Sequence, residues 1–385
     1  MKRTLLRLGA AAFLADMALY LIMTGVPYRA LEMGAGAALL GLLPVARGLP
    51  YTLTVVWAGG RSKPGRRMRP ARFTVAAGVL ATVAFIAAPS LPWIFVLLGV
   101  LGLAFAFYWP ALQATLADLG RAGAAGNLGW FNMAWCSGKA LGFAMGGVLL
   151  AAFGFPALFS MAAVAMVAVI GLIALPVRLF PEATRRADES GRATAVALRP
   201  GNARAFRLAA WTANAVAYGV ATLLNIHYPH WLREIGHGET LLGAYLGLIF
   251  AAQALTFFLL TRFPGWRYRR APLLLLQAPM VLVLLVLPLL RSPAAILATA
   301  PGVGLALGMA YFASLYYSVE APAGRGRNAG LHEAILGIGS MLVPVLGGWV
   351  AGATGRIEAP YLVGAAIGGM GLGVQAMLLR SRAGG

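Results

Sequence analysis

The amino-acid sequence predicts an all-α membrane protein with twelve transmembrane helices in two pseudo-symmetric six-helix bundles. Three observations support this fold class: a series of long apolar runs, an alternation of basic residues between the connections, and a repeat on either side of a polar segment. The composition agrees, since 60% of the 385 residues are hydrophobic and only 11% are charged. A soluble domain of this length does not have such a composition.

The apolar runs have the length of membrane-spanning helices. Most contain the roughly 20 residues that an α-helix needs to cross a hydrocarbon core of about 30 Å. The predicted spans are residues 4–26, 36–58, 73–90, 92–117, 127–152, 156–177, 206–230, 240–261, 271–290, 293–318, 329–353 and 359–379. The first run follows Lys2 and Arg3, as in a signal peptide, but it continues to about Met23 and therefore predicts a span that stays attached.

Basic residues alternate between the connections. Of the 31 Lys and Arg residues, 25 lie at the two termini and in the even-numbered connections. The odd-numbered connections contain four, which are Arg29, Arg233, Arg291 and Arg356. Because basic loops are retained in the cytoplasm, we expect a multi-pass protein of the inner (cytoplasmic) membrane with both termini cytoplasmic. The net charge of +20 lies in short loops next to the spans, so we expect contact with membrane lipid and no nucleic-acid partner.

A polar segment divides the chain into similar halves. Residues 181–205 carry Pro, Gly, Ser and charges of both signs, and they predict a cytoplasmic linker between an N-terminal bundle, 1–180, and a C-terminal bundle, 206–385. Glycines of the fifth and eleventh spans recur at one offset, in the pairs Gly138 and Gly339, Gly146 and Gly347, Gly147 and Gly348, and Gly154 and Gly355. Parallel halves of this kind are a known plan of transporters, with the substrate bound between them.

The connection between the second and third spans resembles a signature of the major facilitator superfamily. Residues 58–67, AGGRSKPGRR, are similar to its G-x-x-x-D-R-x-G-R-R motif, with serine in place of the aspartate. The resemblance implies a gating loop on the cytoplasmic face, formed by Ser62, Lys63, Gly65, Arg66 and Arg67. Asp118, at the cytoplasmic end of the fourth span, is the substitute partner that we expect for the missing aspartate.

A second motif lies in the fifth span. Residues 138–147, GKALGFAMGG, resemble the antiporter signature g-x-x-x-G-P-x-x-G-G, with Phe143 in place of the proline and a proline at Pro344 in the eleventh span. Together with the topology of the whole chain, the resemblance implies the major facilitator fold and alternating access, near the drug/proton antiporter branch. The fourth span, however, lacks the membrane arginine that this branch usually carries.

Three charged residues lie near the middle of predicted spans: Asp16, Arg47 and Lys139. A charge at the bilayer centre costs about 2.5–3.5 kcal/mol on insertion scales, so each of them requires an explanation. An ion pair between Asp16 and one cation accounts for two charges and leaves one positive charge over. This surplus cation suits an anionic or electronegative substrate group, and Arg47 and Lys139 are therefore predicted to bind substrate.

Proton coupling is predicted to involve a carboxylate inside the membrane. Burial favours the protonated form of a carboxylate and a neighbouring cation favours the charged form, so Asp16 is placed to bind and release a proton. Glu333 in the eleventh span is the second candidate. The adjacent His332 is either a proton relay or a contact at the helix N-terminus.

Polar and aromatic residues follow single faces of several spans. Lipid does not favour Asn and Gln at mid-depth, so these faces are expected to turn toward protein or an aqueous cavity. The resemblance places spans one, four, seven and ten around the cavity and span five at the seam between the halves. The further predicted substrate-binding residues are Tyr108, Trp109, Asn132, Trp135, Asn214, Tyr218 and Tyr311.

The leading interpretation is a proton-coupled exporter of a small organic solute that acts as a monomer. The alternative is uptake or facilitated exchange of an anionic metabolite, bound by Arg47 and Lys139. A membrane enzyme, a receptor and a scaffold are other classes. An enzyme would need paired carboxylates, a histidine cluster or a nucleophile in one cavity, and none is evident. The four histidines and Cys136 are widely spread, so we expect no metal and no cofactor.

Overall fold

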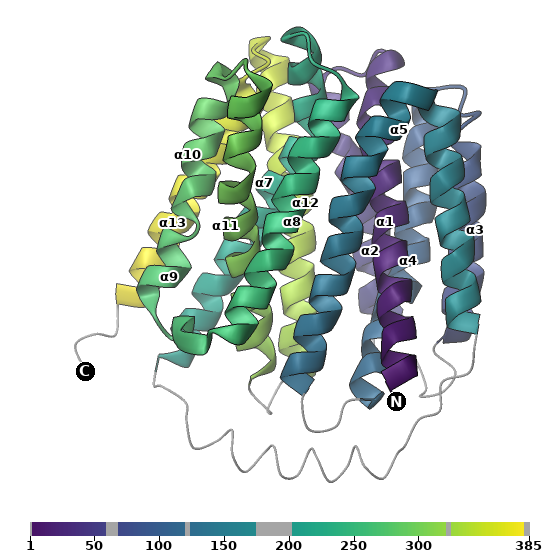
Figure 1. Ribbon diagram of the computed structural model, residues 1–385. Helices are drawn as coiled ribbons and strands as arrows, with labels where there is room; N and C mark the ends of the chain where they lie inside the picture. Colours follow the sequence, from purple (N-terminus) through teal and green to yellow (C-terminus); the bar gives the residue numbers. More distant parts are fainter. Residues whose placement is uncertain (1, 59–67, 120–123, 175–201, 321–324, 381–385) are drawn as a thin grey trace. The chain divides into compact units, whose positions relative to one another are not determined.

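The computed structural model describes residues 2–58, 68–119, 124–174, 202–320 and 325–380, and long helices make up most of them (Figure 1). The gating loop predicted at Ser62, Lys63, Gly65, Arg66 and Arg67 lies outside these residues. The helices are α1 (Lys2–Glu32), α2 (Ala37–Ala58), α3 (Met68–Ala84), α4 (Leu91–Leu119), α5 (Ala124–Ala174), α7 (Ala203–Glu234), α8 (Glu239–Arg262), η1 (Pro264–Trp266), α9 (Arg270–Leu275), α10 (Ala278–Val286), η2 (Leu287–Leu289), α11 (Pro293–Val319), α12 (Arg325–Thr354) and α13 (Ala359–Arg380).

The all-α membrane fold class is confirmed. Nine segments of the described residues are long and apolar enough to cross a membrane. Two helices, α3 and α7, cover predicted spans but are not among the nine. The fifth and sixth predicted spans lie in one helix, α5, which is interrupted at Gly154 with φ 72°. The ninth is divided among α9, α10 and η2. The number of twelve therefore stays a prediction.

The helices pack into two units. Unit 1 comprises Met1–Ala35, Leu43–Asp188 and His237–Gly247, whereas unit 2 comprises Gly36–Leu42, Glu189–Gly236 and Leu248–Gly385. Unit 1 thus includes the first residues of α8, and unit 2 includes the first residues of α2. The predicted boundary at 181–205 falls largely outside the described residues and stays a prediction.

The repeat in the sequence is also a repeat of helix contacts. Gly138 of α5 lies against the backbone of Phe13 in α1, and Gly339 of α12 lies against the backbone of Ala215 in α7. A Cβ atom at either glycine would collide with the facing carbonyl group. Three further glycine contacts with a facing backbone occur in both units. In unit 1 they are Gly147 with Glu239, Gly243 with Phe143, and Gly102 with Arg47. The equivalent contacts in unit 2 are Gly348 with Ala37, Gly41 with Pro344, and Gly304 with Ile249. Close crossings of this type require small residues at the contact.

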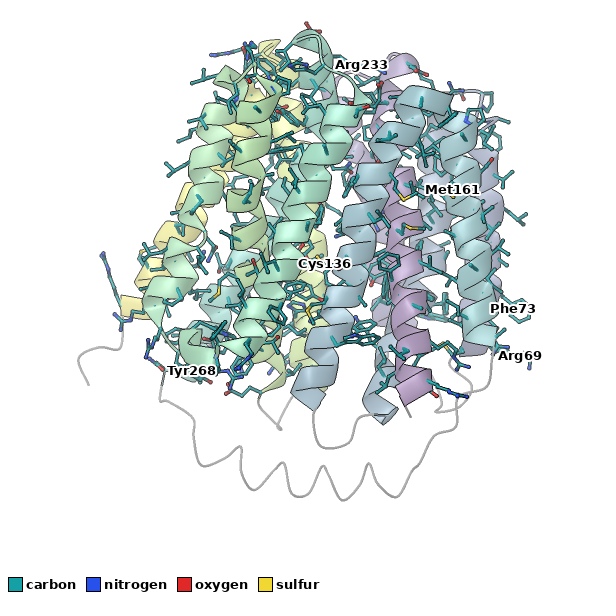
Figure 2. All side chains as sticks on the ribbon, in the orientation of Figure 1. Arg69, Phe73, Cys136, Met161, Arg233 and Tyr268 are labelled. Carbon is teal, nitrogen blue, oxygen red and sulfur yellow. The ribbon has the colours of Figure 1, made fainter. Side chains whose placement is uncertain are left out.

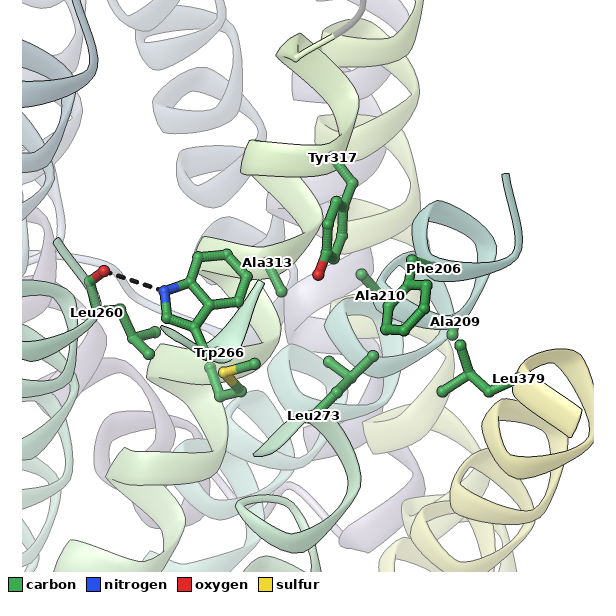
Figure 3. Packing of buried hydrophobic residues seen from close by; sticks show 10 residues of the cluster. Phe206, Ala209, Ala210, Leu260, Trp266, Leu273, Ala313, Tyr317 and Leu379 are labelled. Carbon is green, nitrogen blue, oxygen red and sulfur yellow. Dashed lines mark hydrogen bonds between the residues drawn. The ribbon is translucent and has the colours of Figure 1, made fainter. Parts of the chain in front are cut away.

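A hydrophobic cluster in unit 2 fixes the connection between α8 and α9. The indole Nε1 of Trp266 donates a hydrogen bond to the carbonyl oxygen of Leu260 at 3.0 Å, and the ring packs near Tyr317 (Figure 3). Next to it, Tyr268 adopts φ 54°. Its backbone N–H donates to the Tyr317 hydroxyl at 2.9 Å, and its own hydroxyl donates to Glu320. Burial and the Glu320 carboxylate raise the pKa of Tyr268, so its phenol remains a hydrogen-bond donor.

Candidate functional site

The charged residues of unit 1 lie where α1 crosses α5. Gly138 and Gly142 bring the α5 backbone against Phe13 and Met17 of α1. Lys139 lies between the two glycines, and Asp16 lies between their two partners in α1. Their side chains are 4% and 5% exposed, so neither charge is solvated by bulk water. The small residues of the crossing therefore position an acid and a base close together in the interior of the unit.

Aromatic rings surround the Lys139 ammonium group. Its Nζ lies 4.1 Å from the centroid of the Tyr20 ring and 5.4 Å from that of Trp135. Contacts of a desolvated cation with aromatic faces are worth about 2 kcal/mol. That is a substantial part of the cost of an intramembrane charge on insertion scales. The two rings therefore offset part of the cost of burying the ammonium group.

Asp16 is the electrostatic centre of this group, which we call the charged cluster: Asp16, Arg47 and Lys139. Lys139 and Arg47 are the cations that act on the Asp16 carboxylate. Arg47 is half-buried, and its carbonyl group lies against Gly102 of α4. Tyr108 of α4 is fully buried and within range of the Asp16 charge. Four helices, α1, α2, α4 and α5, thus contribute to one group of predicted site residues.

The other predicted residues of unit 1 extend from this cluster. Trp135 donates a hydrogen bond from Nε1 to Asn132 Oδ1 at 3.0 Å, one turn earlier in α5. Trp109 packs edge-on against Tyr108 with ring centroids 5.1 Å apart. Cys136 is buried within α5 (Figure 2). Asp118 lies in α4, but its side chain is outside the described residues.

A second polar group lies in unit 2, and we call it the amide cluster: Asn214, Tyr218, Gln253, Tyr311, Ser314 and His332. Gln253 Nε2 of α8 donates to the Tyr218 hydroxyl of α7 at 2.8 Å. The Tyr218 and Tyr311 rings lie 5.6 Å apart, and Tyr311 contacts the His332 ring at 4.9 Å. Four helices therefore contribute to one connected group, whose amide side chains are fully buried.

The ring nitrogens of His332 lie close to three side chains. Asn214 Nδ2 lies 3.4 Å from both the carbonyl oxygen and Nδ1 of His332. Ser314 Oγ lies 2.7 Å from the same Nδ1, and the tautomer of the ring sets which of the two atoms donates. The other ring nitrogen, Nε2, lies 4.0 Å from Glu333 Oε1.

Three atoms of the amide cluster have no hydrogen-bond partner among the described residues. They are Asn214 Oδ1, Gln253 Oε1 and His332 Nε2, and all are buried. A buried polar atom without a partner costs about 1–3 kcal/mol. Another pair of buried amides in unit 2 is satisfied: Gln277 and Gln375 exchange two hydrogen bonds, at 2.9 and 3.1 Å. The amide cluster differs from this pair in its three unpartnered atoms.

Several of these residues were not in the predicted site. Tyr20 follows Asp16 by four positions and therefore shares its helix face, a spacing that could have identified it. Gln253 stood out only as a mid-span glutamine. Ser314 gave no signal, because serine is common in membrane helices and only tertiary packing brings it to His332. Glu333 lies in the third turn of α12, which begins at Arg325, earlier than predicted.

The sequence profile of the Major Facilitator Superfamily matches residues 8–331 of this chain. No curated protein sequence matches it. The match ends at Leu331 in the early part of α12, one residue before His332 of the amide cluster.

Two solved structures have a similar fold. The crystal structure of the nucleoside transporter NupG is 13% identical with a TM-score of 0.71, and the match covers 97% of this chain and 98% of that one. A bacterial homologue of the human lysosomal transporter Spinster, in an inward-facing and occupied conformation, is 16% identical with a TM-score of 0.63, over 98% of this chain and 92% of that one. At such identities the similarity concerns the fold alone.

Proposed function

Because the chain belongs to the major facilitator superfamily, we propose that it is a secondary active transporter that exports a small organic solute in exchange for protons. The superfamily consists of transport proteins, so the chain is a multi-pass membrane transporter and not an enzyme. Transport then proceeds by alternating access, with the substrate exposed to one side of the membrane at a time.

The charged cluster is the observation that supports proton coupling. With Asp16 ionised, the cluster of one acid and two bases has a formal charge of +1, and a proton on Asp16 raises it to +2. A cationic substrate binds better to the unprotonated cluster, because the added positive charge of the protonated cluster repels it. Substrate and proton then occupy the cluster in turn, and the protein exchanges one for the other.

The alternative, uptake or exchange of an anionic metabolite, follows from the same cluster with a different substrate. An anion binds better to the charged cluster when Asp16 is protonated and the cluster charge is +2 than when it is +1. The anion would therefore bind together with the proton and move in the same direction. Arg47 and Lys139 would then contact the anionic group directly. The charge of the substrate therefore decides between antiport and symport at this site.

Other residues complete the proposal. The further proposed substrate-binding residues are Tyr108, Trp109, Asn132 and Trp135 in unit 1 and Asn214, Tyr218 and Tyr311 in unit 2. Glu333 is the second candidate for the coupled proton. The gating loop and Asp118, its partner proposed from the sequence, would act on the cytoplasmic face of a monomer in the inner membrane, surrounded by lipid.

The test uses Asp16→Asn, which mimics the permanently protonated carboxylate, in proteoliposomes with a solute found to stabilise the purified protein. We expect exchange of the solute down its own gradient to survive and accumulation driven by a pH gradient to vanish. Wild-type protein in the same vesicles is the reference. If Asp16→Asn still concentrates the solute in response to a pH gradient, Asp16 does not carry the proton, and Glu333→Gln becomes the next variant.

A further inference from the structure

The unpartnered atoms of the amide cluster form a defined hydrogen-bonding pattern. Asn214 Oδ1 and Gln253 Oε1 are acceptors, and His332 Nε2 is a third polar atom without a hydrogen-bond partner among the described residues. All three side chains are completely buried. Their other polar atoms hold them in place, since Gln253 Nε2 is bound to Tyr218 and Asn214 Nδ2 to His332. The cluster therefore presents fixed polar atoms rather than loose side chains.

The fold does not need these atoms to be unpartnered. Gln277 and Gln375, buried in the same unit, use both their oxygen and their nitrogen atoms in a reciprocal pair. His227 likewise places Nε2 3.0 Å from the Pro344 carbonyl oxygen. Unit 2 therefore satisfies a buried amide pair and a buried histidine, whereas the amide cluster leaves three buried polar atoms without a partner among the described residues.

The chemistry of the cluster selects a class of ligand. Two carboxamide oxygens call for two hydrogen-bond donors, and the imidazole Nε2 calls for a third polar atom. The cluster contains no Lys or Arg, so it offers nothing to an anionic group, in contrast to the charged cluster of unit 1. The Glu333 carboxylate lies outside the cluster, with Oε1 4.0 Å from His332 Nε2.

We propose that the amide cluster of unit 2 binds an uncharged polar group that carries two hydrogen-bond donors beside a third polar atom, with Gln253 and His332 as binding residues beside Asn214. A cyclic ureide, with N–H groups on either side of a carbonyl, has this chemistry, and so do neighbouring hydroxyls of a polyol. The inference rests on the proposed transport function and specifies one part of the substrate. Tyr218 and Tyr311 supply the aromatic surface against which this group packs.

The first experiment measures the thermal stability of the purified full-length protein with uracil, 1,3-dimethyluracil, myo-inositol and benzoate at equal concentrations. We expect uracil, myo-inositol or both to raise the melting temperature by about 2 °C or more. Dimethyluracil, which keeps the ring but lacks both donors, should have no effect, and neither should benzoate. A shift with uracil alone identifies the ureide chemistry, and a shift with myo-inositol identifies hydroxyls. If neither uncharged probe shifts the melting temperature, or if dimethyluracil acts as strongly as uracil, the proposal is wrong.

The second experiment separates a binding role from a structural one. Gln253→Leu removes an unpartnered oxygen together with one hydrogen bond, whereas the matched control Gln375→Leu breaks a reciprocal pair. We expect Gln253→Leu to melt close to the wild type without ligand and to lose the shift, and Asn214→Leu to lose it too. Gln375→Leu should melt at a lower temperature and keep the shift. Equal destabilisation by Gln253→Leu and Gln375→Leu, or a shift that persists in Gln253→Leu, would overturn the proposal. Binding at equilibrium needs no pH gradient, so a failure of proton coupling leaves this result unaffected.

Discussion

At the scale of single residues, Lys139 shows how a charge is retained inside the membrane. Its ammonium group lies over the Tyr20 ring, next to Trp135, and shares the α1–α5 crossing with Asp16. The aromatic faces and the acid together offset the cost of burying the cation. Neither replaces hydration completely, which leaves Lys139 able to respond to the charge of a ligand or to a proton on Asp16.

Lys139→Ala should abolish transport of an anionic substrate, because the Lys139 cation is proposed to contact the substrate. The variant should still reach the membrane, because Asp16 without its cation can be buried in the neutral, protonated form. Uptake into proteoliposomes and the amount of purified protein are the two measurements, and Lys139→Arg is the charge-conserving control. Misfolding of Lys139→Ala that is rescued by Asp16→Ala would instead make the pair structural.

At the scale of helices, glycine contacts determine which elements meet. The α1–α5 and α7–α12 crossings are equivalent in the two halves of the sequence, with Gly138 and Gly339 at corresponding positions. The backbones approach so closely that side chains on either side of each crossing are brought together. Asp16 and Lys139 meet in this way in unit 1, and Asn214 and His332 meet at the corresponding crossing in unit 2.

Gly138→Leu and Gly339→Leu should each lower the stability of the protein by about 1–3 kcal/mol or more, because the added side chain collides with a facing backbone carbonyl. The matched controls are Gly171→Leu and Gly369→Leu, at helical glycines with open space around them. Melting temperature in detergent is the measurement. If the melting temperature of a control variant falls as far as that of the crossing variant, the loss of a helical glycine, rather than the collision at the crossing, causes the destabilisation.

At the scale of the whole molecule, the charge alternation and the helices agree on the course of the chain. Arg233 and Tyr268 lie at opposite ends of unit 2, separated by one passage of α8 (Figure 2). The connection around Tyr268 is rich in arginine. The connection between α12 and α13, in contrast, has Arg356 as its one basic residue. Retention of basic connections in the cytoplasm therefore predicts that these two connections lie on opposite sides.

This topology is testable with cysteine substitutions at two exposed arginines, Arg269→Cys and Arg356→Cys. A membrane-impermeant maleimide should label Arg356→Cys in intact cells and Arg269→Cys only after permeabilisation. The native Cys136 is buried and provides the unlabelled background. Labelling of Arg269→Cys in intact cells would invert the orientation or change the number of spans.

Sequence patterns alone were enough to predict the membrane class, the two similar halves and the charged residues that need compensation. Hydrophobic runs, loop charges and glycine spacing are local patterns, and a bilayer constrains them strongly. Which side chains share a partner depends on the tertiary structure. The Tyr20 ring over Lys139, Ser314 beside His332, and the unpartnered oxygen of Gln253 depend on the angle and depth at which helices cross. No local pattern fixes those quantities, because residues far apart in the chain meet only when the glycine contacts have set the crossing.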